Sequence, residues 1–356
     1  MLKTMLDIIQ IDSFRQAVFE RLASVSDSNS YVFPKEFPML YRYTRFGKYS
    51  VNDIIANNIT ATLISEFNDV FDGGLHRYND RSEILKEKEK NWHQYNGILK
   101  LAGLDSPTSY NDYIKMETES IIDRDILGYR TLGYLGSYIC CFSTVNDSIL
   151  MWSHYADSNQ GVCLSYDFNS LKSDDLMRSW IFPVAYTSKP LIIPDVMENN
   201  LVTEYQTEYN VLCNALTKFN IWEYEKEWRL FFQNIVNNYP YEKRMSLKMP
   251  IKPNGIYFGW HFFKQFFHYD DEDKKFTDYK IDLLYKLLDY LEGSQIDVYF
   301  MVPKTGEYVL CPRSITIKLL KNFIHDNIQK NYRTNVKFYT VFLSRLAILL
   351  EEAQNV

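Results

Sequence analysis

The sequence lacks the features that mark secreted, membrane-spanning or disulfide-bonded proteins. Its 356 residues include five cysteines, an odd number without metal-ligand spacing, and we interpret them as reduced core thiols. No apolar run approaches the ~18 residues of a membrane-spanning helix. Asp7, Asp12 and Glu20 interrupt the apolar positions of the first 24 residues, which predicts an amphipathic helix and not a signal peptide. We therefore expect a cytoplasmic protein with no membrane partner.

Positive charge and the common nucleotide and metal motifs are also scarce. The sequence has 39 Lys and Arg residues and 45 Asp and Glu residues. The resulting net charge of −6 argues against nonspecific electrostatic binding of nucleic acid. The sequence contains no P-loop, Rossmann fingerprint, H-E-x-x-H or C-x-x-C pattern, and we predict no bound metal.

Aromatic residues, by contrast, are abundant at 16%, with 28 Tyr and 23 Phe. Tyrosine can bury its ring and keep its hydroxyl in water, so this richness favours cleft linings and interfaces. A simple compositional bias explains it equally well.

The pattern of elements predicts an α+β protein with a mixed or antiparallel, split β-sheet. We expect an N-terminal helical extension (1–38), an α+β core (39–262) with a helical insertion at about 79–133, and a mainly helical C-terminal extension (263–356). Strands are expected at residues 39–43, 59–64, 138–143, 183–186, 228–232 and 255–259, with a helix at about 196–220 and a hairpin at 297–302 and 307–311.

The main catalytic candidate is the segment 223–229, EYEKEWR. If it is extended, Glu223, Glu225, Glu227 and Arg229 lie on one face. Two carboxylates at this spacing can act on one ligand, one binding a sugar hydroxyl and the other holding or activating a nucleophile. The alternative is a solvent-exposed strand face with an internal Glu–Arg pair.

Two further groups have competing interpretations. The loop 67–72, FNDVFD, is either a carboxylate metal loop or a structural loop anchored by its two phenylalanines, and the sequence favours the structural loop. His154 could act as a base, but no Ser-His-Asp or Cys-His order surrounds it, and Ser143 is not in a nucleophile elbow. A helix histidine that makes a hydrogen bond is the favoured interpretation.

Several short motifs between residues 39 and 260 occur in a fixed order. They are LYRY at 40–43, FNDVFD at 67–72, CFS at 141–143, MWSHYAD at 151–157, GVC at 161–163, EKEWR at 225–229 and IYFG at 256–259. Together they resemble the bacterial family DUF2971, which is of unknown function, although Val70 stands where the family pattern has proline.

The order of elements is also similar to the ADP-ribosyltransferase fold. In that fold an early strand carries a His or Arg for NAD, a middle strand ends in Ser or Tyr, and a late strand carries the catalytic Glu, often as E-x-E. Arg42, Ser143 and Glu227 follow this order, with Glu225 as the first carboxylate. The resemblance implies that NAD is the substrate and that ADP-ribose passes to a macromolecular acceptor, protein or nucleic acid.

The same resemblance implies roles for individual residues. Glu227 would stabilise the ribose cation, Glu225 would position the acceptor, and Ser143 would orient the nicotinamide ribose. Arg42 would contact a phosphate, with Tyr41 or Tyr43 on the opposite strand face as alternatives. The implied NAD-binding set is Arg42, Tyr43, Asn68, Trp152, His154 and Tyr155.

The sequence is also compatible with two other functions. One is a metal-dependent nuclease built on Asp69, Asp72, Glu225 and Glu227. The other is a non-enzymatic sensor whose aromatic cleft binds a peptide or nucleotide. By association, the transferase hypothesis extends to a toxin or antiviral (phage-defence) effector. The C-terminal extension suits binding of an inhibitory partner or self-association.

Overall fold

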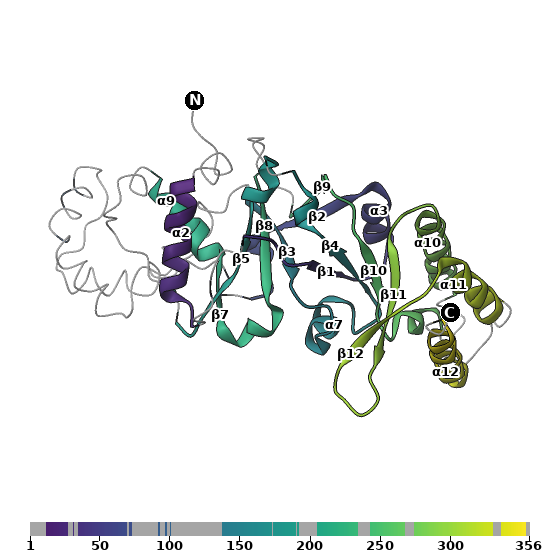
Figure 1. Ribbon diagram of the computed structural model, residues 1–356. Helices are drawn as coiled ribbons and strands as arrows, with labels where there is room; N and C mark the ends of the chain where they lie inside the picture. The colour runs from purple at the N-terminus through teal and green to yellow at the C-terminus, as the bar shows by residue number, and fades with distance from the viewer. Residues whose placement is uncertain are drawn as a thin grey trace.

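The protein is built on one large β-sheet with helices at both ends (Figure 1). The computed structural model describes residues 12–27, 31, 35–69, 71–72, 92, 97, 100, 137–172, 174–189, 191, 205–233, 243–267, 274–329 and 336–353. The expected helical insertion therefore lies outside the described residues, apart from three isolated positions.

The ten-stranded sheet has the order β12-β11-β10-β4-β1-β3-β2-β9, and β8 and β5 branch from β3. Within the described residues β10 and β11 are its one parallel pair, so the predicted α+β class with a mixed, mostly antiparallel sheet is confirmed. A separate parallel pair joins β6 (Ala185–Thr187) to β7 (Thr217–Phe219). The strands of the large sheet are β1 (Leu40–Thr44), β2 (Asn58–Leu63), β3 (Ser137–Ser143), β4 (Val162–Tyr166), β5 (Ile181–Pro183), β8 (Glu227–Gln233), β9 (Arg244–Lys248), β10 (Gly255–Phe258), β11 (Asp297–Pro303) and β12 (Leu310–Ser314).

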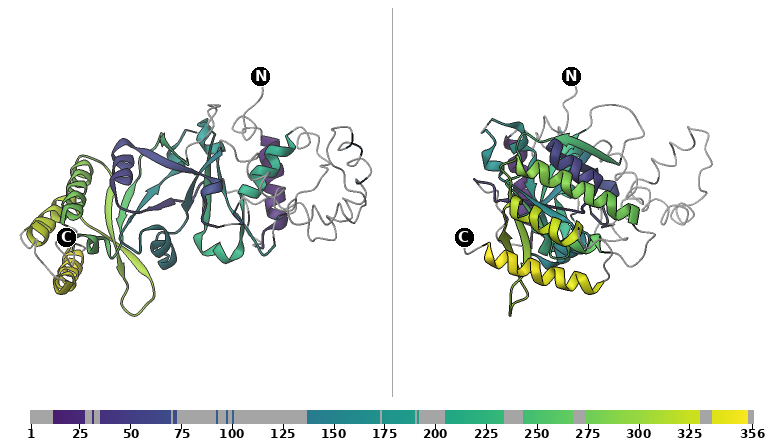
Figure 2. Two further views of the ribbon diagram at one scale, coloured as in Figure 1. Left: turned by 180° about the vertical axis from the view of Figure 1, so that it is seen from behind. Right: turned by 90° about the vertical axis from the view of Figure 1, so that its right-hand side faces the viewer.

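Helices α2 and α9 lie at one end of the sheet, and α10, α11 and α12 lie at the other (Figures 1 and 2). Among the helices that the structure describes, none is long and apolar enough to cross a membrane. The α-helices are α2 (Asp12–Val25), α3 (Lys48–Ala56), α7 (Ile149–Tyr155), α9 (Gln206–Ala215), α10 (Lys274–Glu292), α11 (Ile317–Ile324) and α12 (Val336–Glu352). Shorter 3-10 turns are η1 (Ile64–Glu66), η2 (Phe168–Ser170), η3 (Leu176–Ser179), η4 (Asn220–Glu225) and η5 (Phe262–Phe266), and η7 (His325–Gln329) is a π-helical turn.

The sheet forks at β3, because β1 and β2 share one edge of this strand and then diverge. Tyr41 of β1 pairs with Ser143 at the end of β3, while β2 pairs with the beginning of β3. Arg42 fills the fork: its guanidinium donates to the Thr60 carbonyl at 2.7 Å and contacts the Cys140 sulfur. This position explains a half-buried arginine on an otherwise apolar strand.

The two faces of the sheet bury different cores. One face carries Phe142, Leu164 and Trp228 in the main core, against which α3, α10 and α12 pack. The other face has two smaller clusters: α2 and α9 cover one that includes Phe182, and α7 covers one that includes Trp152. The charged groups described below lie on this second face and contact both α7 and the end of α9.

Two of the expected elements differ in the structure. The expected helix at 196–220 is observed as α9 followed by strand β7, because residues 217–219 pair with β6; residues 196–204 lie outside the described residues. The expected strand at 183–186 is interrupted at Val184, where β5 ends and β6 begins. The division of the chain at residues 38 and 262 remains a prediction, although the pairing of β10 with β11 continues the sheet across the second boundary.

A left-handed turn joins α7 to β4, and the backbone at residue 259 contacts it so closely that only glycine fits there. Asp157, Ser158 and Asn159 have φ values of 51°, 55° and 66°. The Gly259 amide donates to the Gly161 carbonyl at 3.1 Å, and a Cβ added at Gly259 would lie 2.2 Å from the Asn159 carbonyl oxygen. The backbone of β10 therefore approaches this turn too closely for a side chain.

We expect Gly259→Ala to lower the free energy of unfolding by about 1–3 kcal/mol, because the new methyl group must displace backbone. Gly293→Ala is the matched control, since its nearest neighbour, the Tyr290 carbonyl oxygen, would lie 3.9 Å from the new Cβ. Urea unfolding of both variants measures the difference, and equal stabilities would contradict the close approach.

Candidate functional site

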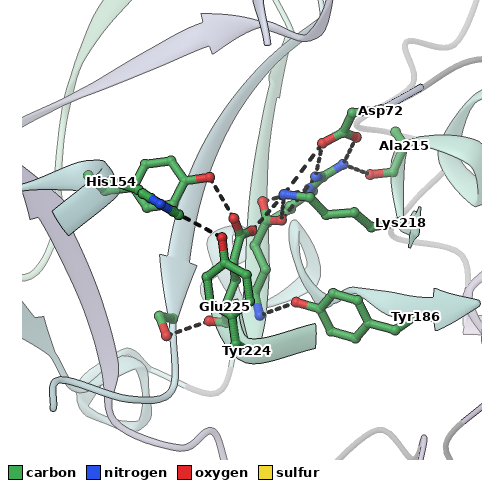
Figure 3. Close-up of polar contacts among 11 residues, drawn as sticks. Asp72, His154, Tyr186, Ala215, Lys218, Tyr224 and Glu225 are labelled. Carbon is green, nitrogen blue, oxygen red and sulfur yellow. Dashed lines mark hydrogen bonds and ion pairs between the residues drawn. The ribbon is translucent and has the colours of Figure 1, made fainter. Parts of the chain in front are cut away.

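Five charged side chains are buried together on the face that α7 and α9 cover (Figure 3). Asp72 follows η1, Lys218 lies on β7, Glu225 ends η4, and Glu227 and Arg229 lie on β8. Each is at most 6% exposed. Charges this deeply buried destabilise a fold unless they are paired, so their contacts decide what the cluster can do.

Arg229 uses all five of its N–H donors. Its terminal nitrogens donate to both oxygens of Asp72 at 2.8 and 2.7 Å, and its Nε and Nη2 donate to Glu227 at 2.8 and 3.0 Å. The remaining donor reaches the carbonyl of Ala215, the last residue of α9. The guanidinium thus joins β8, α9 and the loop of Asp72 in one contact set.

Lys218 joins the two glutamates. Its Nζ lies 2.6 Å from Glu225 Oε2 and 3.1 Å from Glu227 Oε2, and 3.7 Å from the nearer oxygen of Asp72. The other Glu225 oxygen accepts a hydrogen bond from the Tyr155 hydroxyl at 2.5 Å. The carboxylates of Glu225 and Glu227 therefore converge on one ammonium group.

A turn, and not strand alternation, brings these carboxylates together. Residues 220–225 form the 3-10 helix η4, and Lys226 is left-handed with φ 46° before β8 begins at Glu227. The extended interpretation of 223–229 is therefore wrong before Glu227, because period-two alternation holds only in extended backbone. Glu223 consequently points to solvent and pairs with Lys226 at 3.3 Å. The alternative is wrong in its solvent exposure, because Glu225 and Glu227 are buried, but its internal Glu–Arg pair is present between Glu227 and Arg229 at 2.8 Å.

The two glutamates differ in their proton affinity. Burial acts to raise the pKa of Glu227, but the charges of Arg229 and Lys218 outweigh it and hold this pKa well below its usual range. Burial also raises the pKa of Glu225, where Lys218 opposes it, the negative charge of Glu227 adds to it, and the net direction is upward. Two cations cannot fully compensate three carboxylates, and Glu225 is the one that keeps its proton to higher pH.

Ser143 lies beside this pair. It is fully buried and directly opposite Glu227 in the β3–β8 register, and Tyr41 is directly opposite Ser143 in the next pair. Its hydroxyl donates to the Glu225 carbonyl at 2.6 Å and accepts from the Val145 amide at 3.1 Å. The serine thus fixes the turn that carries Glu225.

Two of the residues expected to bind NAD lie near the pair, on α7. Tyr155 contacts Glu225 directly, and the exposed His154 contacts the Tyr224 hydroxyl at 3.1 Å. This contact agrees with the favoured interpretation of His154 as a hydrogen-bonding residue.

The other expected NAD-binding residues are placed differently. Trp152 has no exposed ring, since it is fully buried and its Nε1 donates to the Asn146 carbonyl at 2.6 Å. Tyr43 packs edge-on against Trp152, and Asn68 is exposed in the loop of Asp72. Arg42 projects from the opposite face of the sheet from Ser143 and Glu227, so the structure does not bring it to the carboxylates. Its neighbour Tyr41 is on their face.

The sequence reasoning did not find Lys218, Tyr186 or Tyr224. The Tyr186 hydroxyl accepts from the Glu227 amide at 2.8 Å, and the Tyr224 hydroxyl meets His154. Lys218 had one signal that could have been used: it is a lone cation beside the apolar run VLCNAL. A buried lysine needs carboxylate partners, which would have directed attention to Glu225 and Glu227.

The cluster does not present free carboxylates to a metal. Among the described residues, no group of three or more His, Cys, Asp or Glu side chains is arranged to hold a metal ion. Lys218 and Arg229 occupy the oxygens of Asp72, Glu225 and Glu227, and Asp69 caps the Phe71 amide at 2.9 Å. A divalent cation would have to displace both basic side chains.

Comparison with known proteins identifies one region of the chain. Residues 151–230 match the family model described as a protein of unknown function, DUF2971. The resemblance to DUF2971 is thereby confirmed from α7 to the middle of β8, a region that includes Lys218, both buried glutamates and Arg229. No curated protein and no solved structure matches the chain.

We expect Arg229→Met to lower the free energy of unfolding by about 3–5 kcal/mol, because it leaves Asp72 and Glu227 buried without their main partner. Lys226→Met is the control, since its pair with Glu223 is half-exposed and contributes little. Chemical denaturation compares the two. Similar losses in both variants would show that the buried pairing does not stabilise the fold.

Glu225 makes a specific contribution to the pH dependence of stability. Its raised pKa means that the native protein binds more protons than the unfolded chain above the unfolded pKa of about 4.3. The contribution of Glu225 to the free energy of unfolding therefore falls as pH rises from the unfolded pKa through the raised native pKa. Glu227 behaves oppositely: its stabilisation is present above the unfolded pKa and is lost only as pH falls through the lowered pKa.

We expect Glu225→Gln to remove this falling component, so that the stability of the variant relative to wild type increases as pH rises above about 4.3. Denaturant unfolding across the acidic to neutral range measures it. Glu223→Gln should show no such trend, because Glu223 is exposed. A constant difference between wild type and Glu225→Gln would contradict the assignment.

Proposed function

We propose that this protein is an NAD-cleaving enzyme of the ADP-ribosyltransferase type, with Glu225 and Glu227 at its reaction centre. The observation that supports it most is the row Tyr41–Ser143–Glu227, in which each residue is directly opposite the next on the adjacent strands β1, β3 and β8. These are the early, middle and late strands that the resemblance implies for NAD binding, ribose orientation and the catalytic carboxylate.

The opposite pKa directions of the two glutamates suit this chemistry. Cleavage breaks the bond between ribose and nicotinamide, and nicotinamide leaves with the electron pair. The ionised Glu227 would stabilise the developing positive charge on the ribose. Glu225, with a raised pKa, would accept the proton from the attacking acceptor group. On this face Tyr41, and not Arg42, would be the β1 residue near NAD.

The acceptor, a protein or a nucleic acid, is part of the same proposal. So is a role as a toxin or phage-defence effector that a partner restrains through the C-terminal part of the chain.

The second candidate is a non-enzymatic binding module. The complete pairing of Arg229 favours a structural role for the cluster. Phe219 at the end of β7 and Ile221 in η4 are 47% and 66% exposed and offer an apolar surface for a peptide or nucleotide.

The test is nicotinamide release and transfer of labelled ADP-ribose from NAD to total cell protein and RNA. We expect Glu227→Gln to lower the rate by ~10²–10³-fold, because it removes a preorganised charge at the ribose. Glu223→Gln, a change of the same kind at an exposed position two residues before Glu225, should keep the wild-type rate.

Circular dichroism and thermal unfolding of each variant separate loss of chemistry from loss of fold. Release without transfer would identify an NAD hydrolase that uses the same carboxylates. If wild-type protein gives neither product and calorimetry detects no NAD binding, the transferase proposal fails and the binding module replaces it.

A further inference from the structure

Asp72 is the one member of the charged cluster that lies outside residues 218–229. It is 6% exposed and receives two hydrogen bonds from Arg229, at 2.8 and 2.7 Å. The same carboxylate lies 3.7 Å from Lys218 Nζ. Asp72 therefore touches both cations of the cluster.

The loop that carries Asp72 is shaped around Arg229. The Phe67 ring centroid lies 5.3 Å from the guanidinium carbon, and Asp72 closes on the same group from the other end of the loop. Between them the Asp69 side chain accepts from the Phe71 amide at 2.9 Å, and its carbonyl accepts from the Asp72 amide at 3.2 Å. The internal hydrogen bonds of the loop thus hold Asp72 in place.

We propose that Asp72 is a positioning residue for the Glu225–Glu227 pair, which it controls by binding both of the cations that hold the pair. Arg229 is fixed by Asp72 on one side and presents Nε and Nη2 to Glu227 on the other. Lys218 is shared among three carboxylates and is not fully available to Glu225. The catalytic meaning of this control rests on the proposed function, whereas the electrostatic coupling does not.

The coupling follows from counting the charges. With Asp72 ionised, two cations face three carboxylates, and Glu225 is left with the weakest compensation. Without the Asp72 charge, two cations face two carboxylates, and Lys218 pairs fully with Glu225. The groups that face the Glu225–Glu227 pair from the surrounding elements are Lys218 on β7, Arg229 on β8, Tyr155 on α7, Tyr186 on β6, Tyr224 on η4 and Cys141 on β3, and Asp72 contacts the two cations. Asp72 is the carboxylate of the cluster that lies outside the Glu225–Glu227 turn, so it can be changed without replacing either glutamate.

The experiment is a double-mutant cycle with Asp72→Asn, Glu225→Gln and the combined variant, each unfolded by denaturant at a series of pH values. Asp72→Glu retains the charge, and Glu66→Gln is a control at the end of η1, just before the loop, where Glu66 pairs with the exposed Lys243. We expect Asp72→Asn to move the Glu225-linked fall in stability to lower pH and Asp72→Glu to keep it near wild type. In the Glu225→Gln background, Asp72→Asn should lower stability without producing this shift, because no carboxyl group remains at position 225 to titrate.

An Asp72→Asn variant that is less stable than wild type but retains the same Glu225-linked pH dependence would overturn the proposal and leave Asp72 as an anchor only. If Asp72→Asn is not recovered folded, the pH dependence of the free energy of unfolding is compared between wild type and Glu225→Gln. Absence of any Glu225-linked pH dependence in this comparison overturns the proposal as well.

The catalytic consequence is read separately from the pH profile of nicotinamide release. We expect the acidic limb of this profile to move to lower pH in Asp72→Asn, with no shift in Glu66→Gln. A shifted stability profile in a protein that never cleaves NAD would support the coupling and defeat the proposed function. If wild type cleaves NAD and the acidic limb of the profile is identical in wild type and Asp72→Asn, the result would support the proposed function and defeat the coupling.

Discussion

The buried guanidinium of Arg229 is the contact on which the centre of this structure depends. Its five donors connect β8 to the end of α9, 14 residues earlier, and to the loop of Asp72, 157 residues earlier. A charge with no exposure is tolerated only when every donor has a partner, so each of these segments must dock for the others to be stable. The geometry of the Glu225–Glu227 turn is a consequence of that requirement.

The fork at β3 determines which residues can meet at this centre. Because opposed residues in antiparallel strands share a face, Tyr41, Ser143 and Glu227 form a row on the side covered by α7 and α9. Arg42, one residue along, projects to the other side and fills the gap between β1 and β2. One step in register thus separates a residue beside the carboxylates from a residue that supports the sheet.

The unequal number of charges gives the cluster its chemical character. Burial, together with the negative charge of Glu227, leaves Glu225 with a raised pKa beside the ionised Glu227, although Lys218 opposes this shift. Tyr155 and Lys218 each hold one oxygen of Glu225, so its proton exchange is tied to α7 and β7. The same arrangement pairs the buried charges and places a carboxyl group with a raised pKa beside an ionised carboxylate.

The sequence by itself determined the α+β class and the positions of most strands, and it drew attention to Ser143, Glu225 and Glu227, because apolar alternation and short polar motifs are local signals. It could not determine the backbone of residues 223–226, since the left-handed Lys226 is set by the hydrogen bonds of the surrounding turn. Nor could it find Lys218 or the role of Asp72, whose partners lie on other segments of the chain. Burial and pairing of charges are decided by tertiary packing alone, because a charged side chain in a sequence carries no mark of the partner that will neutralise it.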